Sequence, residues 1–178
     1  FYARKGFRVI SIEANPASAE LANDRYTDLI KTGQIRIINY AISDQEGAIK
    51  LYVCNEESGK STTNKDIMKH LVHVGFSFNE IKVPCLRIDE IFAEYGIPYY
   101  MKIDIEGYDL LLLEQILKTG VQPNFISVEL DVRQSSRMVG LLETLGYREF
   151  QLVSQKSVPN QKEPNPVREG NAIMPSFS

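Results

Sequence analysis

YYMKIDIEGYDLLLLEQILKT, residues 99–119, is the stretch of sequence that decides the fold class. Residues 99–105 predict a β-strand. Residues 108–119 predict a helix so apolar that most of it must be buried. A short acidic turn joins the two. A strand that leads directly into a buried helix is typical of an α/β protein.

The same alternation runs along the rest of the chain. Strands are predicted at residues 7–12, 34–40, 48–53, 79–86, 99–105, 124–130 and 147–153, and helices at 16–31, 64–74, 87–95, 108–119 and 134–145. Strands separated by helices of about 10–15 residues imply parallel crossovers, so the predicted fold class is α/β with a doubly wound, mostly parallel sheet. We expect residues 79–86 to form an edge strand, because Pro84 cannot donate a hydrogen bond to a ladder.

Length and composition bound the domain organisation. The chain has 178 residues, of which 43% are hydrophobic and 24% charged, as in an ordinary globular protein. We expect one domain over residues 1–153, followed by a tail over 154–178, where Pro and polar residues dominate.

Charge and cysteine content exclude several classes of protein. The net charge of −3 leaves no basic excess for binding phosphates, so we expect no nucleic-acid partner. The longest apolar runs fall far short of the roughly 20 residues that span a bilayer. Cys54 and Cys85 have neither the number nor the spacing of a disulfide scaffold or a zinc ribbon. We therefore predict a reducing, cytoplasmic setting and no structural metal.

Acidic residues follow the predicted strands repeatedly. Glu13 ends the first strand, Asp104 and Glu106 end the 99–105 strand, and Glu129 and Asp131 end the 124–130 strand. Ligands of open parallel sheets bind beyond the carboxyl ends of the strands. The predicted site is therefore rich in hydrogen-bond acceptors, which suit hydroxyl groups and cations better than bare phosphates.

Two of these positions have competing interpretations. Glu13 can bind the two ribose hydroxyls of a nucleotide-like cofactor, or it can be a surface carboxylate favoured by the dipole of the following helix. Asp104 can act on a ligand, or it can cap the next helix. We favour the ligand for Asp104, because two acids and Gly107 at one strand end exceed what capping needs.

Two other patterns are interpreted as structural. His70 and His73 lie three apart on a predicted helix, but no third residue with matching spacing completes a metal site. The stretch SGKST at residues 58–62 lacks the first glycine of a phosphate-binding loop and does not join a strand directly to a helix. Neither pattern is predicted to carry chemistry.

Several blocks together resemble a known family. They are VISIEANP (9–16), INYAISDQEG (38–47), LRIDEIF (86–92), MKIDIEGYDLLLL (101–113) and ISVEL (126–130). In this order they are similar to the FkbM-type methyltransferases. The resemblance covers about residues 7–131. It implies a Rossmann-like methyltransferase fold and S-adenosylmethionine (SAM) as cofactor.

The resemblance also implies roles for single residues. Glu13 would hold the ribose hydroxyls of SAM, with Asn15 beside it in the cofactor site. Asn39, Ala41 and Ile42 would flank the adenine. Asp104 would face the methyl-transfer site as the catalytic base or as the group that orients the acceptor, with Glu106 next to it. The acceptor would be a hydroxyl oxygen on a small molecule or sugar, and no metal would be required.

The termini depart from the pattern of that family. The family opens with a strand and a D-x-G-A-N-x-G loop, which are missing before residue 7. We therefore expect an interior segment, inactive by itself, in which the 7–13 and 99–105 strands either pair directly or leave their edges open to self-association.

Two other functions stay open at this point. One is another nucleotide-binding α/β enzyme, such as a dehydrogenase. The other is a non-catalytic or degenerate module on the same fold. The sequence indicates neither the acceptor nor the oligomeric state.

Overall fold

A computed structural model describes residues 2–130 and 132–153. The elements, in chain order, are η1 Ala3–Lys5, β1 Val9–Ile12, α1 Pro16–Arg25, α2 Thr27–Lys31, β2 Ile35–Ile38, β3 Ala41–Ile42, β4 Ala48–Cys54, η2 Ser58–Lys60, α3 Lys65–His73, β5 Phe78–Leu86, α4 Ile88–Tyr95, β6 Tyr100–Ile103, α5 Asp109–Thr119, β7 Phe125–Val128 and α6 Ser135–Thr144. The α/β class is confirmed. The predicted tail over 154–178 lies outside the described residues.

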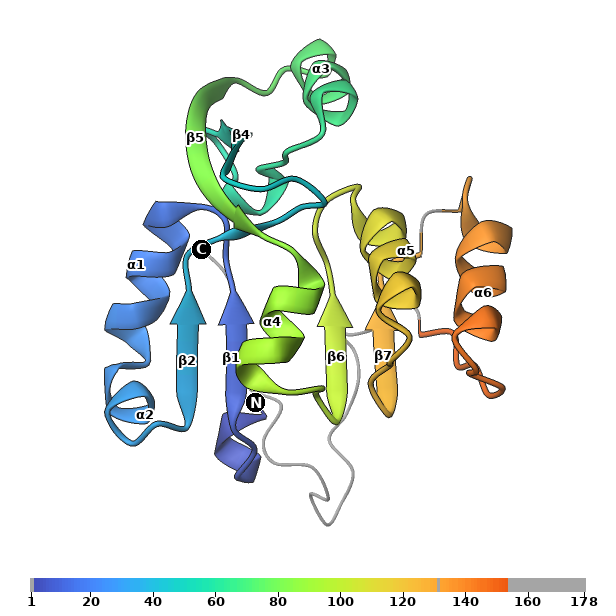
Figure 1. The fold of residues 1–178 in the computed structure, drawn as a ribbon. Helices are drawn as coiled ribbons and strands as arrows, with labels where there is room; N and C mark the ends of the chain where they lie inside the picture. The colour runs from blue at the N-terminus through green and yellow to red at the C-terminus, as the bar shows by residue number, and fades with distance from the viewer. Residues whose placement is uncertain (1, 131, 154–178) are drawn as a thin grey trace, which may run out of the picture.

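The strands of the described residues form three small sheets. β1 pairs in parallel with β2, β6 pairs in parallel with β7, and β5 lies between β3 and β4. Figure 1 shows β2, β1, β6 and β7 pointing the same way, so their carboxyl ends face the same end of the molecule. Direct pairing of β1 with β6, one of the two expected outcomes, does not occur in this part of the chain.

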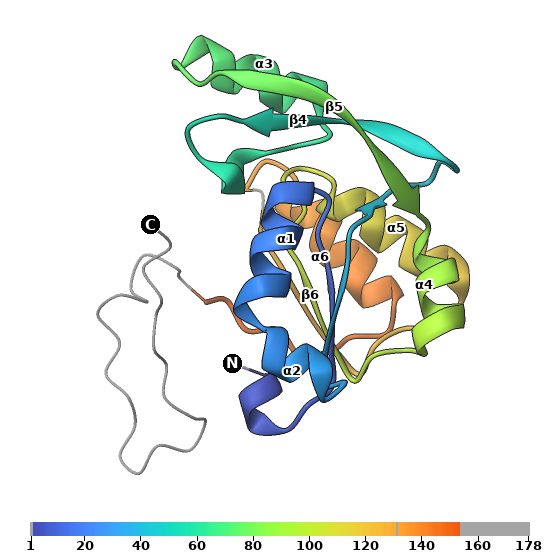
Figure 2. The same ribbon diagram turned by 90° about the vertical axis from the view of Figure 1, so that its left-hand side faces the viewer.

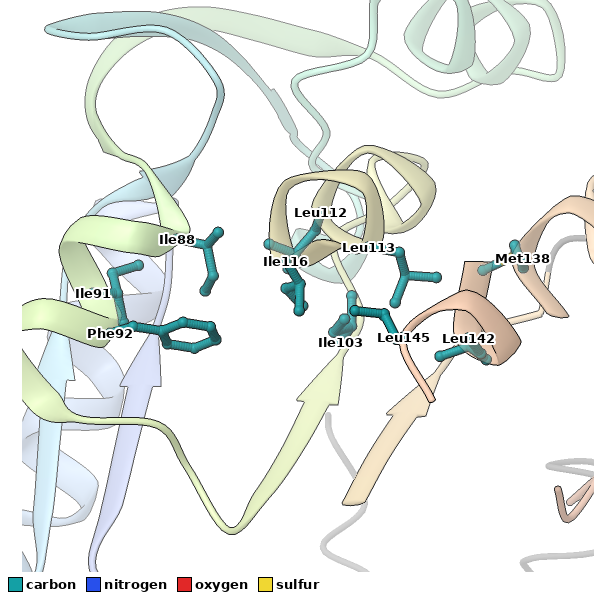
Figure 3. Packing of buried hydrophobic residues seen from close by; sticks show 10 residues of the cluster. All are labelled: Ile88, Ile91, Phe92, Ile103, Leu112, Leu113, Ile116, Met138, Leu142 and Leu145. Atoms are coloured by element: carbon teal, nitrogen blue, oxygen red, sulfur yellow. The ribbon is translucent and has the colours of Figure 1, made fainter. Parts of the chain in front are cut away.

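The main core lies between β6, β7 and the helices α4, α5 and α6. Leu113 and Ile116 of α5 have no exposed surface, which confirms that the apolar helix is buried. Figure 3 shows Ile103 of β6 and Met138 of α6 packed around them. Fully burying one such side chain stabilises the fold by about 1.5–3 kcal/mol. This packing holds the carboxyl end of β6 in place.

The first helical segment is divided in two. Asn15 caps α1 and Pro16 occupies its first turn, where its missing N–H costs no hydrogen bond. The predicted single helix over residues 16–31 is wrong, because α1 ends at Arg25 and α2 begins at Thr27. At the break the Thr27 hydroxyl donates to the carbonyl groups of the preceding turn. In Figure 2 α1 and α2 lie on one side of the strands and α4 on the other.

β5 combines an edge strand with a short central stretch. Over most of its length it pairs only with β4, in antiparallel register. Its last two residues, Cys85 and Leu86, also pair with β3, which was not predicted. The Cys85 N–H points toward β4, because it donates to the Gly47 carbonyl. The nitrogen of the preceding residue, Pro84, therefore points to the opposite edge of β5. The pairing of that edge with β3 begins only at Cys85. The ladder therefore loses no hydrogen bond at Pro84.

The last predicted strand is wrong. Residues 147–153 form neither a strand nor a helix, and residues 148–153 are exposed. The Tyr147 hydroxyl donates to the Pro123 carbonyl at 2.6 Å, which ties the start of this segment to the loop before β7. No helix in the described part of the chain is both long and apolar enough to cross a bilayer.

Candidate active site

A pocket of about 290 Å³ lies at the carboxyl ends of β1 and β6. Its walls come from residues 12–15 at the end of β1, Tyr40 and strand β3, and Leu51 of β4. The polar segment 58–63 except Lys60 and residues 104–106 and 108 after β6 complete them. Of the residues predicted from the sequence, the pocket brings together Glu13, Asn15, Ala41, Ile42, Asp104 and Glu106. It does not include Asn39.

The end of β1 presents one half-buried carboxylate to the pocket. The Asn15 N–H donates to Glu13 Oε1 at 2.8 Å. The Asn15 side chain itself is occupied, because its Oδ1 caps α1 by accepting from the Ala17 N–H at 3.1 Å. Burial raises the pKa of Glu13, and the hydrogen bond from Asn15 partly opposes this rise. No side chain in the described residues binds the second oxygen of Glu13, so that oxygen is available to a ligand.

Asn39 supports the site from behind its wall. Its Nδ2 donates to the carbonyl oxygens of Glu13 at 2.8 Å and Ala14 at 3.2 Å. The amide therefore ties the chain leaving β1 to the end of β2. The two residues predicted with it, Ala41 and Ile42, do line the pocket, and Ala41 is buried.

The two acids after β6 have different surroundings. Asp104 is exposed, and its carboxylate pairs with Lys102 on the same strand. Asp104 does not cap α5: the N-cap is Tyr108, whose side chain makes no capping bond, and the Ile105 N–H is bound by Asp109 at 3.3 Å. The alternative interpretation of Asp104 as a helix cap is therefore wrong.

Glu106 is half-buried in the pocket wall. Its pKa is raised, mainly because burial removes water from the carboxylate, and further by repulsion from the neighbouring acids Asp104, Glu129 and Asp109. Lys60 partly opposes this rise. A carboxylate with a raised pKa is a better proton acceptor near neutral pH than an ordinary one.

Among the described residues, the other candidates from the sequence do not line the pocket. Glu129 is exposed and is not among the lining residues, although burial and the charges of Asp104 and Asp109 raise its pKa. Asp131 lies outside the described residues. His70 and His73 are exposed on α3 and do not line the pocket.

One wall of the pocket was missed by sequence reasoning. The stretch SGKST at residues 58–62 was predicted to carry no chemistry, yet the polar segment 58–63 lines the pocket through Ser58, Gly59, Ser61, Thr62 and Thr63. Residues Ser58–Lys60 form the short helix η2, and Thr62 pairs with Tyr52 in an isolated bridge. The sequence signal in this segment is its high content of Ser and Thr. That content does not show which part of the fold the segment contacts.

The comparisons with known proteins bear on this geometry. The family model described as the Methyltransferase FkbM domain matches residues 1–149. The chain belongs to this family. The resemblance inferred from the sequence blocks is thereby confirmed, and family membership favours a methyltransferase over the dehydrogenase alternative. Searches of curated proteins and of solved structures found no match.

Proposed function

We propose that this FkbM-domain protein is a SAM-dependent methyltransferase that acts on a hydroxyl oxygen of a small molecule or sugar. The observation that carries the proposal is the pocket shared by Glu13 and Glu106, two half-buried carboxylates with raised pKa values on different strand ends. Titratable groups perturbed in this way cluster at functional sites. The proposal includes one doubly wound, Rossmann-like sheet, which the common direction of β2, β1, β6 and β7 supports.

The residues present fit the nucleoside part of SAM. The second oxygen of the Glu13 carboxylate suits ribose hydroxyls, which are hydrogen-bond donors. The side chains of Ile12 and Ile42 and the small side chain of Ala41 offer apolar surface suited to an adenine ring. When bound, SAM supplies a methyl group on a positively charged sulfur, which leaves as a neutral thioether.

The acids after β6 are placed to act on the acceptor. We assign the role of base to Glu106, because Lys102 holds the carboxylate of Asp104 while Glu106 is half-buried with a raised pKa. Glu106 takes the proton of the acceptor hydroxyl as the oxygen–carbon bond forms, a contribution of about 10²–10⁴-fold to the rate. Asp104 then orients the acceptor, and correct alignment supplies much of the remaining acceleration.

The test compares Glu106→Gln with Asp104→Asn in the full-length protein, using radiolabelled SAM and a panel of glycosides and small alcohols as acceptors. Glu106→Gln should lower turnover by about 10²–10⁴-fold, with affinity for SAM changed less than about twofold. Asp104→Asn should have a smaller effect on turnover. Glu143→Gln, an exposed carboxylate on α6, is the matched control.

Two results would count against this assignment. Wild-type turnover in Glu106→Gln would remove Glu106 as the base. Failure of the full-length wild-type protein to bind SAM in calorimetric titration would remove the cofactor from the proposal and would favour the non-catalytic alternative.

A further inference from the structure

Thr62 connects the polar segment 58–63 to the end of β6. Thr62 as a whole residue is only 2% exposed. The Thr62 hydroxyl donates to the carbonyl oxygen of Glu106 at 2.8 Å and accepts from the Asn64 N–H at 3.0 Å. Its own N–H and carbonyl pair with Tyr52 of β4. The backbone of Thr62 is therefore held by β4, and its side chain is held by Glu106 and Asn64. Among the described residues, the hydroxyl makes the one hydrogen bond between Thr62 and Glu106.

The backbone that receives this hydrogen bond is strained. Glu106 has a φ of +45°, in the left-handed region that a residue other than glycine rarely adopts, and Gly107 follows with a φ of +94°. Such a conformation persists only when the surrounding structure holds it. Thr62 is the side chain that binds the peptide group of Glu106, so it is placed to supply that restraint.

A second contact docks the same part of the chain on this turn. A Cβ atom at Gly107 would overlap Cδ1 of Ile67, which lies in α3. The φ of Gly107 favours glycine, and the side chain of Ile67 would have to turn aside for any larger residue at this position. Segment 58–63 and the start of α3 thus rest together on the Glu106–Gly107 turn, and Thr62 contributes the directional part of the contact.

We propose that Thr62 is a positioning residue, which holds the Glu106 turn so that the Glu106 carboxylate stays in the pocket wall. The proposal rests on the proposed function in so far as Glu106 is the base, although the contact itself does not depend on it. Threonine suits this role because its β-branched side chain is stiff and its hydroxyl donates and accepts at once. Through Thr62, segment 58–63 both lines the pocket and holds the proposed base in position.

The test measures the titration of Glu106 and the activity of the same variants. Protein labelled with ¹³C at glutamate carboxyl groups is titrated by NMR, and Glu106→Gln assigns the resonance. The charged groups that act on Glu106 are Asp104, Glu129, Asp109 and Lys60, and all of them stay unchanged in the variants. Thr62→Val keeps the shape of the side chain and removes the hydroxyl, whereas Thr62→Ser keeps the hydroxyl.

We expect Thr62→Val to lower the pKa of Glu106 toward its ordinary value, because the released turn admits water to the carboxylate. The acidic limb of the plot of kcat against pH should move to lower pH by the same amount. kcat should fall about tenfold or more, while KM for SAM changes less than twofold. Thr62→Ser should restore all three quantities.

The matched control is Thr119→Val at the C-terminal end of α5, the opposite end of the helix from the pocket residue Tyr108. The Thr119 hydroxyl also donates to a carbonyl, of Ile116 at 2.7 Å, and accepts from an N–H, of Val121 at 3.2 Å. Its loss should lower the melting temperature and leave the titration of Glu106 as in the wild type.

An unchanged Glu106 titration in folded Thr62→Val would overturn the proposal. If Thr62→Val does not fold, Thr62→Cys is used instead, because a thiol is a weaker hydrogen-bond donor than a hydroxyl. The pKa of Glu106 should then fall by less than is expected for Thr62→Val. An unchanged pKa of Glu106 in Thr62→Cys would equally overturn the proposal. A shifted Glu106 titration in a protein whose wild type neither binds SAM nor transfers methyl would support the positioning role and overturn the proposed function, so the two failures are distinguishable.

Discussion

Replacing Glu13 with Gln separates cofactor binding from folding. Glu13 Oε1 accepts from the Asn15 N–H, and a Gln side-chain oxygen can accept the same hydrogen bond. The other oxygen becomes an NH₂ group, which can no longer accept from a ribose hydroxyl. A hydrogen bond to a charged group is worth about 1.5–3 kcal/mol, so affinity for SAM should fall roughly 10–150-fold.

The thermal stability of the same variant should not fall at neutral pH, although its affinity for SAM does. Burial raises the pKa of folded Glu13 above its unfolded value. Its contribution to stability is therefore fully present below the ordinary glutamate pKa of about 4.3 and is lost as pH rises through the raised folded pKa. At neutral pH the wild type carries a desolvated charge that Gln lacks. Glu13→Gln should thus melt no lower than the wild type at pH 7, and its stability should vary less with pH over that window.

Calorimetric titration with SAM and thermal melting at pH 4 to 8 measure both effects. Glu20→Gln, an exposed carboxylate on α1, is the control and should change neither quantity. Unchanged affinity for SAM in Glu13→Gln would refute the ribose assignment. Weaker binding together with a lower melting temperature at pH 7 would show that Glu13 supports the fold, and that the reasoning from desolvation is wrong.

Two further predictions concern stability. Gln115 is buried in α5, and neither polar atom of its side-chain amide has a hydrogen-bond partner in the described residues. Gln115→Met should therefore stabilise the protein by about 1 kcal/mol, which raises the melting temperature by about 2–4 °C. A lower melting temperature in that variant would show that the amide is satisfied. Gly107→Ala should destabilise more than Gly47→Ala in denaturant titrations, because both have φ above +90° but only Gly107 faces Ile67, whereas the Gly47 position is open. Equal losses, each of about 1–2 kcal/mol, would show that the contact with α3 is unimportant.

Sequence reasoning located most of the pocket because the relevant signals are local. A run of apolar residues followed by an acid marks the end of a strand, and this placed Glu13, Asp104 and Glu106 at one end of the sheet strands, where they line one pocket. The capped start of α1 and the buried α5 follow from neighbouring residues alone. The strand predicted at 147–153 failed because a strand needs a partner edge, and composition does not show whether one is available.

The sequence by itself determined the α/β class, the order of most elements and the acids at their ends, because these depend on side chains a few residues apart. The tertiary structure alone decided what each polar group does. Asn39 binds the backbone of Glu13, 26 residues away, and Thr62 binds that of Glu106, 44 residues away. Such contacts exist only once packing has brought distant segments together. The same packing removes water from Glu106 and raises its pKa, and this rise is why we propose Glu106 rather than Asp104 as the base.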